Sequence, residues 1–114
     1  MLPEITVTDL AEKMKSKDSF ILLDVREPHE LSYAKITDER LETAPMSQLA
    51  RIGTDALSES AQSQDAVVYV MCHHGNRSQQ VTAWLAQHGW KNVFNVRGGI
   101  DEYARKVDQA VGFY

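Results

Sequence analysis

Cysteine is almost absent from this sequence of 114 residues, because Cys72 is the only one. A single cysteine excludes an intrachain disulfide and any metal site built from several cysteines. Long apolar runs are also absent, since none approaches the ~20 residues that cross a bilayer. The first residues carry neither the basic region nor the apolar region of a secretory signal. We therefore expect a soluble, cytoplasmic protein.

Positively charged residues are also few. The sequence has 12 Lys and Arg against 16 Asp and Glu, which gives a net charge of −4. Nucleic acids and anionic membranes require a basic face, so neither is expected as a partner. A small anionic substrate is still allowed, because it responds to local charge. Shares of 43% apolar and 25% charged residues are typical of a globular protein. The length fits one domain, residues 1–114.

Short apolar runs predict the strands. The three strongest are Phe20–Leu23, Val67–Met71 and Val93–Val96, and two weaker ones are Ile5–Val7 and Leu41–Ala44. The strong runs are rich in β-branched or aromatic residues and hardly alternate with polar ones. This pattern is typical of strands that are covered on both faces of a sheet.

Apolar residues at helical spacing predict helices between these strands. The expected helices are residues 7–14, 78–88 and 100–107, and shorter ones that begin at Pro28 and at Ser47 and end by Gly53. Thr8 is the expected N-cap of the first helix, and Gly89 is the expected stop of the second. Strands that alternate with helices predict an α/β fold, with a mostly parallel sheet of about five strands and helices on both faces.

This architecture predicts where a ligand binds. In open α/β sheets, ligands lie beyond the carboxyl ends of the strands. Three segments leave predicted strands there, namely Asp24–Pro28, Cys72–Ser78 and Arg97–Gly99. We expect all three to meet at one edge of the sheet.

The loop after the central predicted strand carries Cys72 and leads directly into a helix. A helix N-terminus favours a thiolate through its dipole and its free N–H groups. Gly75 and Asn76 tolerate left-handed conformations, so the loop can curl and turn its amides inward as an anion-binding nest. Arg77 adds a permanent charge, and Ser78 either caps the helix or offers its hydroxyl to the sulfur. Together these residues predict a nucleophile inside an anion cradle.

A less reactive interpretation also exists, because a lone cysteine at the end of a buried strand is usually an inert apolar residue. The order of strand, cysteine, glycine, arginine, serine and helix favours the reactive one. His73 and His74 either supply a general base or point outward and use only their amides, and we favour the second interpretation. Adjacent residues rarely converge on one ion, so we expect no metal and no cofactor.

Asp24 and Arg26 lie at the same predicted edge as supporting residues. They either orient the cysteine loop or form a structural ion pair that fixes the turn after the strand, and we favour the ion pair. Arg97 either contacts an anionic donor or anchors the glycine turn that follows it.

Four motifs in order resemble the rhodanese-like domain family in its small single-domain form. They are Ile5–Leu10, Leu23–Glu30 with its D-V-R-E-x-x-E pattern, Cys72–Ser78 with its C-x-x-G-x-R-S pattern, and Val96–Gly99 with its double glycine. The resemblance covers nearly the whole chain. It implies a three-layer rhodanese-like domain over residues 1–114 and the activity of a thiosulfate sulfurtransferase.

The resemblance also implies a mechanism. Cys72 takes a sulfur atom from thiosulfate or another sulfane donor as a persulfide and passes it to cyanide, a small thiol, thioredoxin or a sulfur-carrier protein. The loop is implied to bind the substrate through His73, His74, Gly75, Asn76, Arg77 and Ser78. Arg77 either steadies the sulfonate end of the donor or braces the loop.

Two other functions compete with sulfur transfer. A phosphatase or arsenate reductase uses a C-x5-R loop, but only four residues separate Cys72 from Arg77. The shorter loop makes a tighter ring of amides that suits one sulfur atom better than a phosphoryl group. A non-catalytic binding module is the second alternative, and an intact cysteine cradle argues against it.

Overall fold

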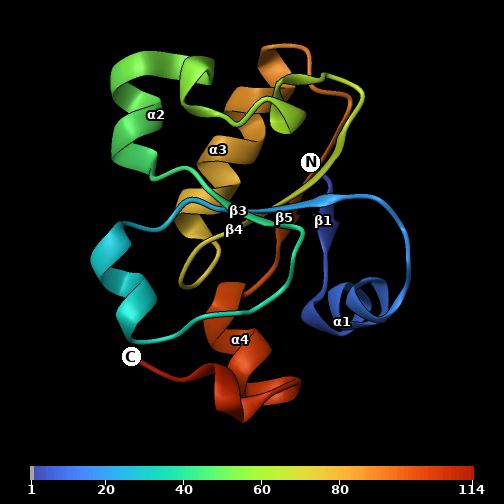
Figure 1. The fold of residues 1–114 in the computed structure, drawn as a ribbon, viewed down its shortest axis with the longest axis vertical. Coiled ribbons are helices and arrows are strands. Elements are labelled where there is room, and N and C mark those ends of the chain that lie inside the picture. Colours follow the sequence, from blue (N-terminus) through green and yellow to red (C-terminus); the bar gives the residue numbers. More distant parts are fainter. Residues whose placement is uncertain (1) are drawn as a thin grey trace.

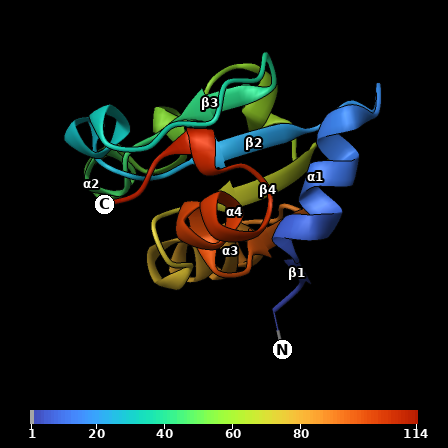
Figure 2. The same ribbon diagram turned by 90° about the horizontal axis from the view of Figure 1, so that it is seen from below.

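A parallel sheet of five strands runs through the middle of the molecule, with helices on both of its faces (Figure 1). This computed structural model describes residues 2–114, and Met1 lies outside the described residues. The strand order is β1-β5-β4-β2-β3, and every neighbouring pair is parallel. Helices α2 and α3 cover one face, and α1 and α4 cover the other (Figures 1 and 2). The predicted three-layer α/β fold is therefore confirmed.

All five predicted strands are present, and no strand end differs from its prediction by more than two residues. The strands are β1 (Glu4–Ile5), β2 (Ile21–Asp24), β3 (Leu41–Thr43), β4 (Val67–Met71) and β5 (Asn92–Val96). The helices are α1 (Val7–Lys15), α2 (Met46–Ile52), α3 (Asn76–Gln87) and α4 (Gly99–Lys106), with 3-10 turns η1 (Pro28–Ser32), η2 (Gly53–Ala56), η3 (Ser60–Gln62) and η4 (Gln109–Val111). None of the helices in residues 2–114 has the length and apolar character needed to span a membrane.

The residues that cap two helices differ from the sequence prediction. Thr6 rather than Thr8 caps α1, because its hydroxyl oxygen accepts the N–H of Asp9 at 3.1 Å. The helix itself starts at Val7, as predicted. Helix α3 begins at Asn76, so Ser78 lies inside its first turn and does not cap it.

Two apolar cores flank the sheet. Leu23 of β2 packs in the core under α2 and α3, whereas its neighbour Leu22 packs in the core under α1 and α4. Successive strand residues point to opposite faces, so a strand between two helical layers is apolar at every position. This explains why the central strands lack alternation.

The three segments expected at one edge of the sheet do meet there. Beyond the β2–β4 ladder, the N–H of Val25 donates to the carbonyl oxygen of Met71 at 3.0 Å. The N–H of Ile100, at the start of α4, donates to the carbonyl oxygen of Cys72 at 2.9 Å. The carboxyl edge of the sheet therefore gathers the loops that carry the predicted site.

Candidate active site

Cys72 lies between the end of β4 and the start of α3, and only 1% of its surface is exposed. Its sulfur accepts the N–H of Gly75 at 3.1 Å and the N–H of Ser78 at 3.3 Å. The hydroxyl oxygen of Ser78 lies 3.3 Å from the same sulfur. The thiol is thus buried, but peptide hydrogens point at it. Two of the six loop amides, rather than all of them, contact the sulfur.

The curl of the loop depends on Gly75. It occupies the N-cap position of α3 with φ of 102°, a left-handed conformation that glycine adopts without steric cost. Within residues 2–114 every positive φ belongs to a glycine, so Asn76 does not use the left-handed conformation that asparagine tolerates. Asn76 is instead the first residue of the helix. The sulfur therefore faces the positive end of a helix of 12 residues.

Asn95 of β5 forms hydrogen bonds with two residues of the loop. The hydroxyl of Ser78 donates to its side-chain oxygen at 2.6 Å, and its side-chain N–H donates to the carbonyl oxygen of Gly75 at 3.4 Å. Asn95 and Ser78 are both buried. Asn95 was not among the predicted site residues, although a polar residue inside an apolar strand was a signal that could have identified it.

The double glycine lets α4 dock against the loop. The first amides of α4 donate to the loop, from Ile100 to the Cys72 carbonyl at 2.9 Å and from Asp101 to the His73 carbonyl at 3.0 Å. Gly99 has φ of 62°, and a Cβ atom there would lie 2.4 Å from the carbonyl oxygen of His73. Any other residue at position 99 would push the helix away from the loop.

Arg77 forms a two-pronged ion pair with Glu30 of η1, at 2.7 and 2.8 Å. These hydrogen bonds lower the pKa of Glu30 to about 2, and burial opposes the shift. The N–H of Glu27 and the hydroxyl of Tyr114 also donate to the carboxylate, at 2.8 and 3.0 Å. The pairing raises the pKa of Arg77 in turn. The ion pair thus fixes the guanidinium of Arg77 and connects the cysteine loop to η1.

Glu30 was not among the predicted site residues. It closes the D-V-R-E-x-x-E motif, and the position of that motif next to the predicted edge was the signal for its role.

Asp24 and Arg26 form a buried ion pair in the turn between β2 and η1. The closest approach is 2.8 Å, and at most 1% of either side chain is exposed. The backbone N–H of Arg26 also donates to the Asp24 carboxylate at 3.1 Å. One further guanidinium N–H donates to the hydroxyl of Tyr114 at 3.1 Å. The ion pair stabilises the turn. Through the hydroxyl of Tyr114, which also donates to Glu30, it is connected to the residue that pairs with Arg77. Arg97 is exposed, and its backbone N–H donates to the Ile5 carbonyl at 3.0 Å.

Four aromatic side chains form a continuous stack beside the loop. The ring centroids of Tyr33 and Tyr114 are 5.6 Å apart, those of Tyr114 and His73 are 3.7 Å apart, and those of His73 and His74 are 3.9 Å apart. Burial lowers the pKa of His73, and the neighbouring His74 adds to the effect. The Nε2 atom of His73 is buried and has no hydrogen-bond partner among residues 2–114. A neutral His73 ring is the form that these surroundings favour.

His73, His74 and Asp101 are the described residues that come closest to a metal-binding group, with ligand atoms within 4.8 Å of one another. The two imidazole rings are stacked, with 29° between their planes. Their lone pairs lie in these nearly parallel planes and do not converge on one point. The Asp101 carboxylate already accepts a hydrogen bond from Arg105 at 2.9 Å. This arrangement does not fit a metal ion.

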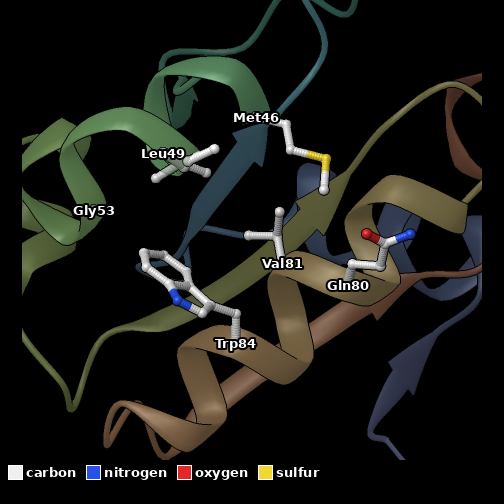
Figure 3. Close-up of a pocket in the computed structure, with 7 residues that line it drawn as sticks. Met46, Leu49, Gly53, Gln80, Val81 and Trp84 are labelled. Atoms are coloured by element: carbon white, nitrogen blue, oxygen red, sulfur yellow. The ribbon is translucent and has the colours of Figure 1, made fainter.

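A hollow of about 370 Å³ lies between α2 and α3. Val81 and Trp84 of α3 point toward Met46 and Leu49 of α2 across it (Figure 3). None of its lining residues is charged, so the hollow supplies no charged group to the chemistry at Cys72.

The comparison with family models gives a match described as "Rhodanese-like domain" over residues 6–106. The chain belongs to the rhodanese-like domain family. A protein of Allochromatium vinosum named "Sulfurtransferase" is 35% identical over 92% of this chain and 91% of its own length. The crystal structure of a rhodanese-related protein from Thermoplasma volcanium has a TM-score of 0.74 and 33% identity, over 92% of this chain and 93% of that one.

Some relatives are much longer than this rhodanese-like domain. The "Rhodanese-like/PpiC domain-containing protein 12, chloroplastic" of Arabidopsis thaliana is 35% identical over 97% of this chain. The chain spans only 37% of that relative's length. The rhodanese-like domain is thus found both in proteins of this size and as part of larger ones.

Proposed function

We propose that this rhodanese-like domain is a sulfurtransferase that moves sulfane sulfur through a persulfide on Cys72. The single observation that carries the proposal is the pair of N–H groups, from Gly75 and Ser78, that point at the Cys72 sulfur at the start of α3. The family match and a relative named as a sulfurtransferase support the same chemistry. We infer thiosulfate, or a related sulfane compound, as the donor.

The first step is the attack of the Cys72 thiolate on the outer sulfur of thiosulfate. A new S–S bond forms, and the S–S bond of the donor breaks and leaves its electron pair on sulfite. The terminal sulfur of the resulting persulfide carries the negative charge. Backbone N–H groups that are already oriented stabilise such a charge without reorganisation, in the manner of an oxyanion hole.

The second step returns the enzyme to its starting form. A nucleophile attacks the terminal sulfur, so cyanide becomes thiocyanate or a thiol becomes a persulfide, and the electron pair returns to Cys72 as thiolate. Because the chain has a single cysteine, it cannot resolve its own persulfide. The acceptor is therefore external, and we propose a small thiol, thioredoxin or a sulfur-carrier protein.

The charged groups near the loop are largely compensated. Glu30 holds Arg77 in a bidentate pair, and the lowered pKa of His73 keeps its ring neutral near pH 7. We infer that the amides and the dipole of α3 provide most of the stabilisation of the bound sulfur. Arg77 then acts mainly as a brace for the loop.

Intact-protein mass spectrometry after treatment with thiosulfate tests the proposal. Wild type is expected to gain the mass of one sulfur atom and to form thiocyanate when cyanide is added. The variant Cys72→Ser is expected to do neither. Thiocyanate formation by Cys72→Ser at the wild-type rate would overturn the mechanism. Hydrolysis of p-nitrophenyl phosphate by wild type, without persulfide formation, would show that the loop serves phosphoryl chemistry instead.

A further inference from the structure

The buried state of Cys72 poses an access problem. Only 1% of its surface is exposed, and the β4–α3 loop folds back so that Gly75 and Ser78 contact its sulfur. A donor or acceptor must reach that sulfur, so some part of the surrounding structure has to move. The contacts that hold residues 73–77 in place therefore control access.

Tyr114 contacts one end of this segment directly and the other end through Glu30. Its ring stacks on His73 with centroids 3.7 Å apart and 7° between the planes. Its hydroxyl donates at 3.0 Å to the carboxylate of Glu30, which forms the ion pair with Arg77. Arg26, from the buried ion pair, donates to the same hydroxyl at 3.1 Å. Among the described residues, Tyr114 is the side chain that both stacks on His73 and hydrogen-bonds to Glu30.

The segment before Tyr114 is itself anchored against the turn that follows η1. The N–H of Lys35 donates to the Val111 carbonyl at 3.0 Å. Gly112 has φ of 104°, and a Cβ atom there would lie 2.6 Å from the carbonyl oxygen of Tyr33. The ring of Tyr33 also stacks on that of Tyr114. These contacts direct Tyr114 toward the loop rather than into solvent.

We propose that Tyr114 is a positioning residue that clamps residues 73–77 over Cys72 and limits the size of the molecules that reach the thiol. The clamp is made of one aromatic stack and hydrogen bonds to two charged groups, and 37% of Tyr114 is exposed. Such contacts can release and re-form without unfolding the core. Thiosulfate needs only a small opening, whereas a bulky persulfide donor needs Tyr114 to detach. The part that concerns donors rests on the proposed sulfur transfer, but the clamp itself does not.

Alkylation of the single cysteine tests the clamp without reference to turnover. The second-order rate constants for iodoacetamide, a small probe, and fluorescein maleimide, a large one, are measured on the intact chain. Tyr114→Ala is expected to raise the ratio of the large-probe rate to the small-probe rate by about tenfold, since a stack and charge-assisted hydrogen bonds are lost. A general loosening of the fold would raise both rates together and leave the ratio unchanged, which would overturn the proposal.

Phe113→Ala is the matched control. Phe113 is the neighbouring aromatic residue, but its ring lies 5.7 Å from the guanidinium carbon of Arg105, on α4. Its removal is expected to leave the ratio at the wild-type value, and a rise equal to that of Tyr114→Ala would contradict a specific clamp. Tyr114→Phe keeps the stack on His73 and loses the hydroxyl, so its ratio is expected between those of wild type and Tyr114→Ala. A ratio for Tyr114→Phe above that of Tyr114→Ala would also contradict the proposal.

Donor selectivity provides the second readout. The ratio of kcat/KM for glutathione persulfide to kcat/KM for thiosulfate is expected to rise in Tyr114→Ala and to stay constant in Phe113→Ala. If wild type transfers sulfur from neither donor, the proposed function fails, while the alkylation ratio still decides whether the clamp exists. If sulfur transfer occurs and both ratios are insensitive to Tyr114, the clamp is wrong and the function stands.

Discussion

The hydroxyl of Ser78 donates a 2.6 Å hydrogen bond to the side-chain oxygen of Asn95, and the same hydroxyl oxygen lies 3.3 Å from the sulfur of Cys72. A hydroxyl carries one hydrogen, so Asn95 and a charged sulfur compete for it. All three residues are buried, which makes each of these contacts stronger than it would be in water. The Cys72 sulfur is thereby linked to β5, the strand that pairs with β4.

The first prediction concerns Ser78→Ala. Loss of the hydroxyl leaves the side-chain oxygen of Asn95 without its donor and removes a group that can turn to the thiolate. We expect the rate of iodoacetamide alkylation of Cys72 to fall by about three- to tenfold and the free energy of unfolding to fall by about 1–3 kcal/mol.

Thr82→Val is the control for Ser78→Ala. The Thr82 hydroxyl donates to the Ser78 carbonyl at 2.7 Å inside the same helix and makes no contact with the sulfur. Thr82→Val is expected to lower the free energy of unfolding without slowing the alkylation of Cys72. Equal alkylation rates in the two variants would show that the Ser78 hydroxyl does not assist the sulfur.

The second prediction compares two glycines with positive φ. A Cβ atom at Gly99 would lie 2.4 Å from the His73 carbonyl oxygen, whereas one at Gly53 meets nothing within 4 Å. Gly53→Ala is expected to cost about 1–3 kcal/mol of unfolding free energy from the backbone alone, because φ of 68° with ψ of −149° lies in a region that is nearly restricted to glycine. Gly99→Ala is expected to cost about 1–3 kcal/mol more, from the clash. Urea unfolding of both variants measures the difference.

Gly99→Ala is also expected to reduce persulfide formation, because the clash moves α4 away from the carbonyl groups of Cys72 and His73. Gly53→Ala is expected to keep the wild-type yield of persulfide. The opposite order of yields would mean that the docking of α4 does not set the shape of the loop.

Much of the fold could be predicted from local sequence patterns. Unalternated apolar runs identified the strands, and the segment from Val67 to Ser78 predicted a thiol at a helix N-terminus. These features depend on residues close together in the chain, and periodicity reports them directly. The mistakes were also local. Thr8 was the predicted cap of the first helix, but Thr6, with the same side chain two residues earlier, is the cap. Ser78 was a candidate cap for α3, but Gly75 occupies that position.

The partners of the loop could not be predicted in the same way. Glu30 and Arg77 are 47 residues apart, and Tyr114 and Glu30 are 84 residues apart. No local pattern encodes such pairs, because they depend on which strand ends become neighbours in the sheet. The motif that contains Glu30 was visible, but its role as the partner of Arg77 required the folded chain.

The third prediction concerns the buried ion pair of Asp24 and Arg26. Arg26→Met leaves the Asp24 carboxylate buried without its partner, so we expect a loss of about 3–5 kcal/mol of unfolding free energy. In the double variant Asp24→Asn with Arg26→Met, no charge is buried, and we expect part of the loss to be recovered. Chemical denaturation of the single and double variants tests this. A double variant less stable than Arg26→Met alone would show that the pair's hydrogen bonds matter more than its charge.

The fourth prediction follows from the lowered pKa of Glu30. Its pKa falls from an ordinary value of 4.5 to about 2, mainly through hydrogen bonds from Arg77. The folded state therefore binds its proton less readily than the unfolded state does. The resulting stabilisation is fully present above pH 4.5 and is lost as the pH falls toward 2. At about 1.4 kcal/mol per pKa unit it amounts to at most about 3.5 kcal/mol, and solvent around Arg77, whose side chain is 34% exposed, reduces it.

Glu30→Gln removes the charge and keeps the shape of the side chain. At pH 7 we expect it to be less stable than wild type, and we expect the difference to shrink as the pH falls through the window from 4.5 to about 2. Glu12→Gln is the control, because Glu12 is 71% exposed and its pair with Lys15 lies on the surface, where such pairs contribute little. A stability difference for Glu30→Gln that stays constant across the window would mean that packing, rather than the charge pair with Arg77, connects η1 to the cysteine loop.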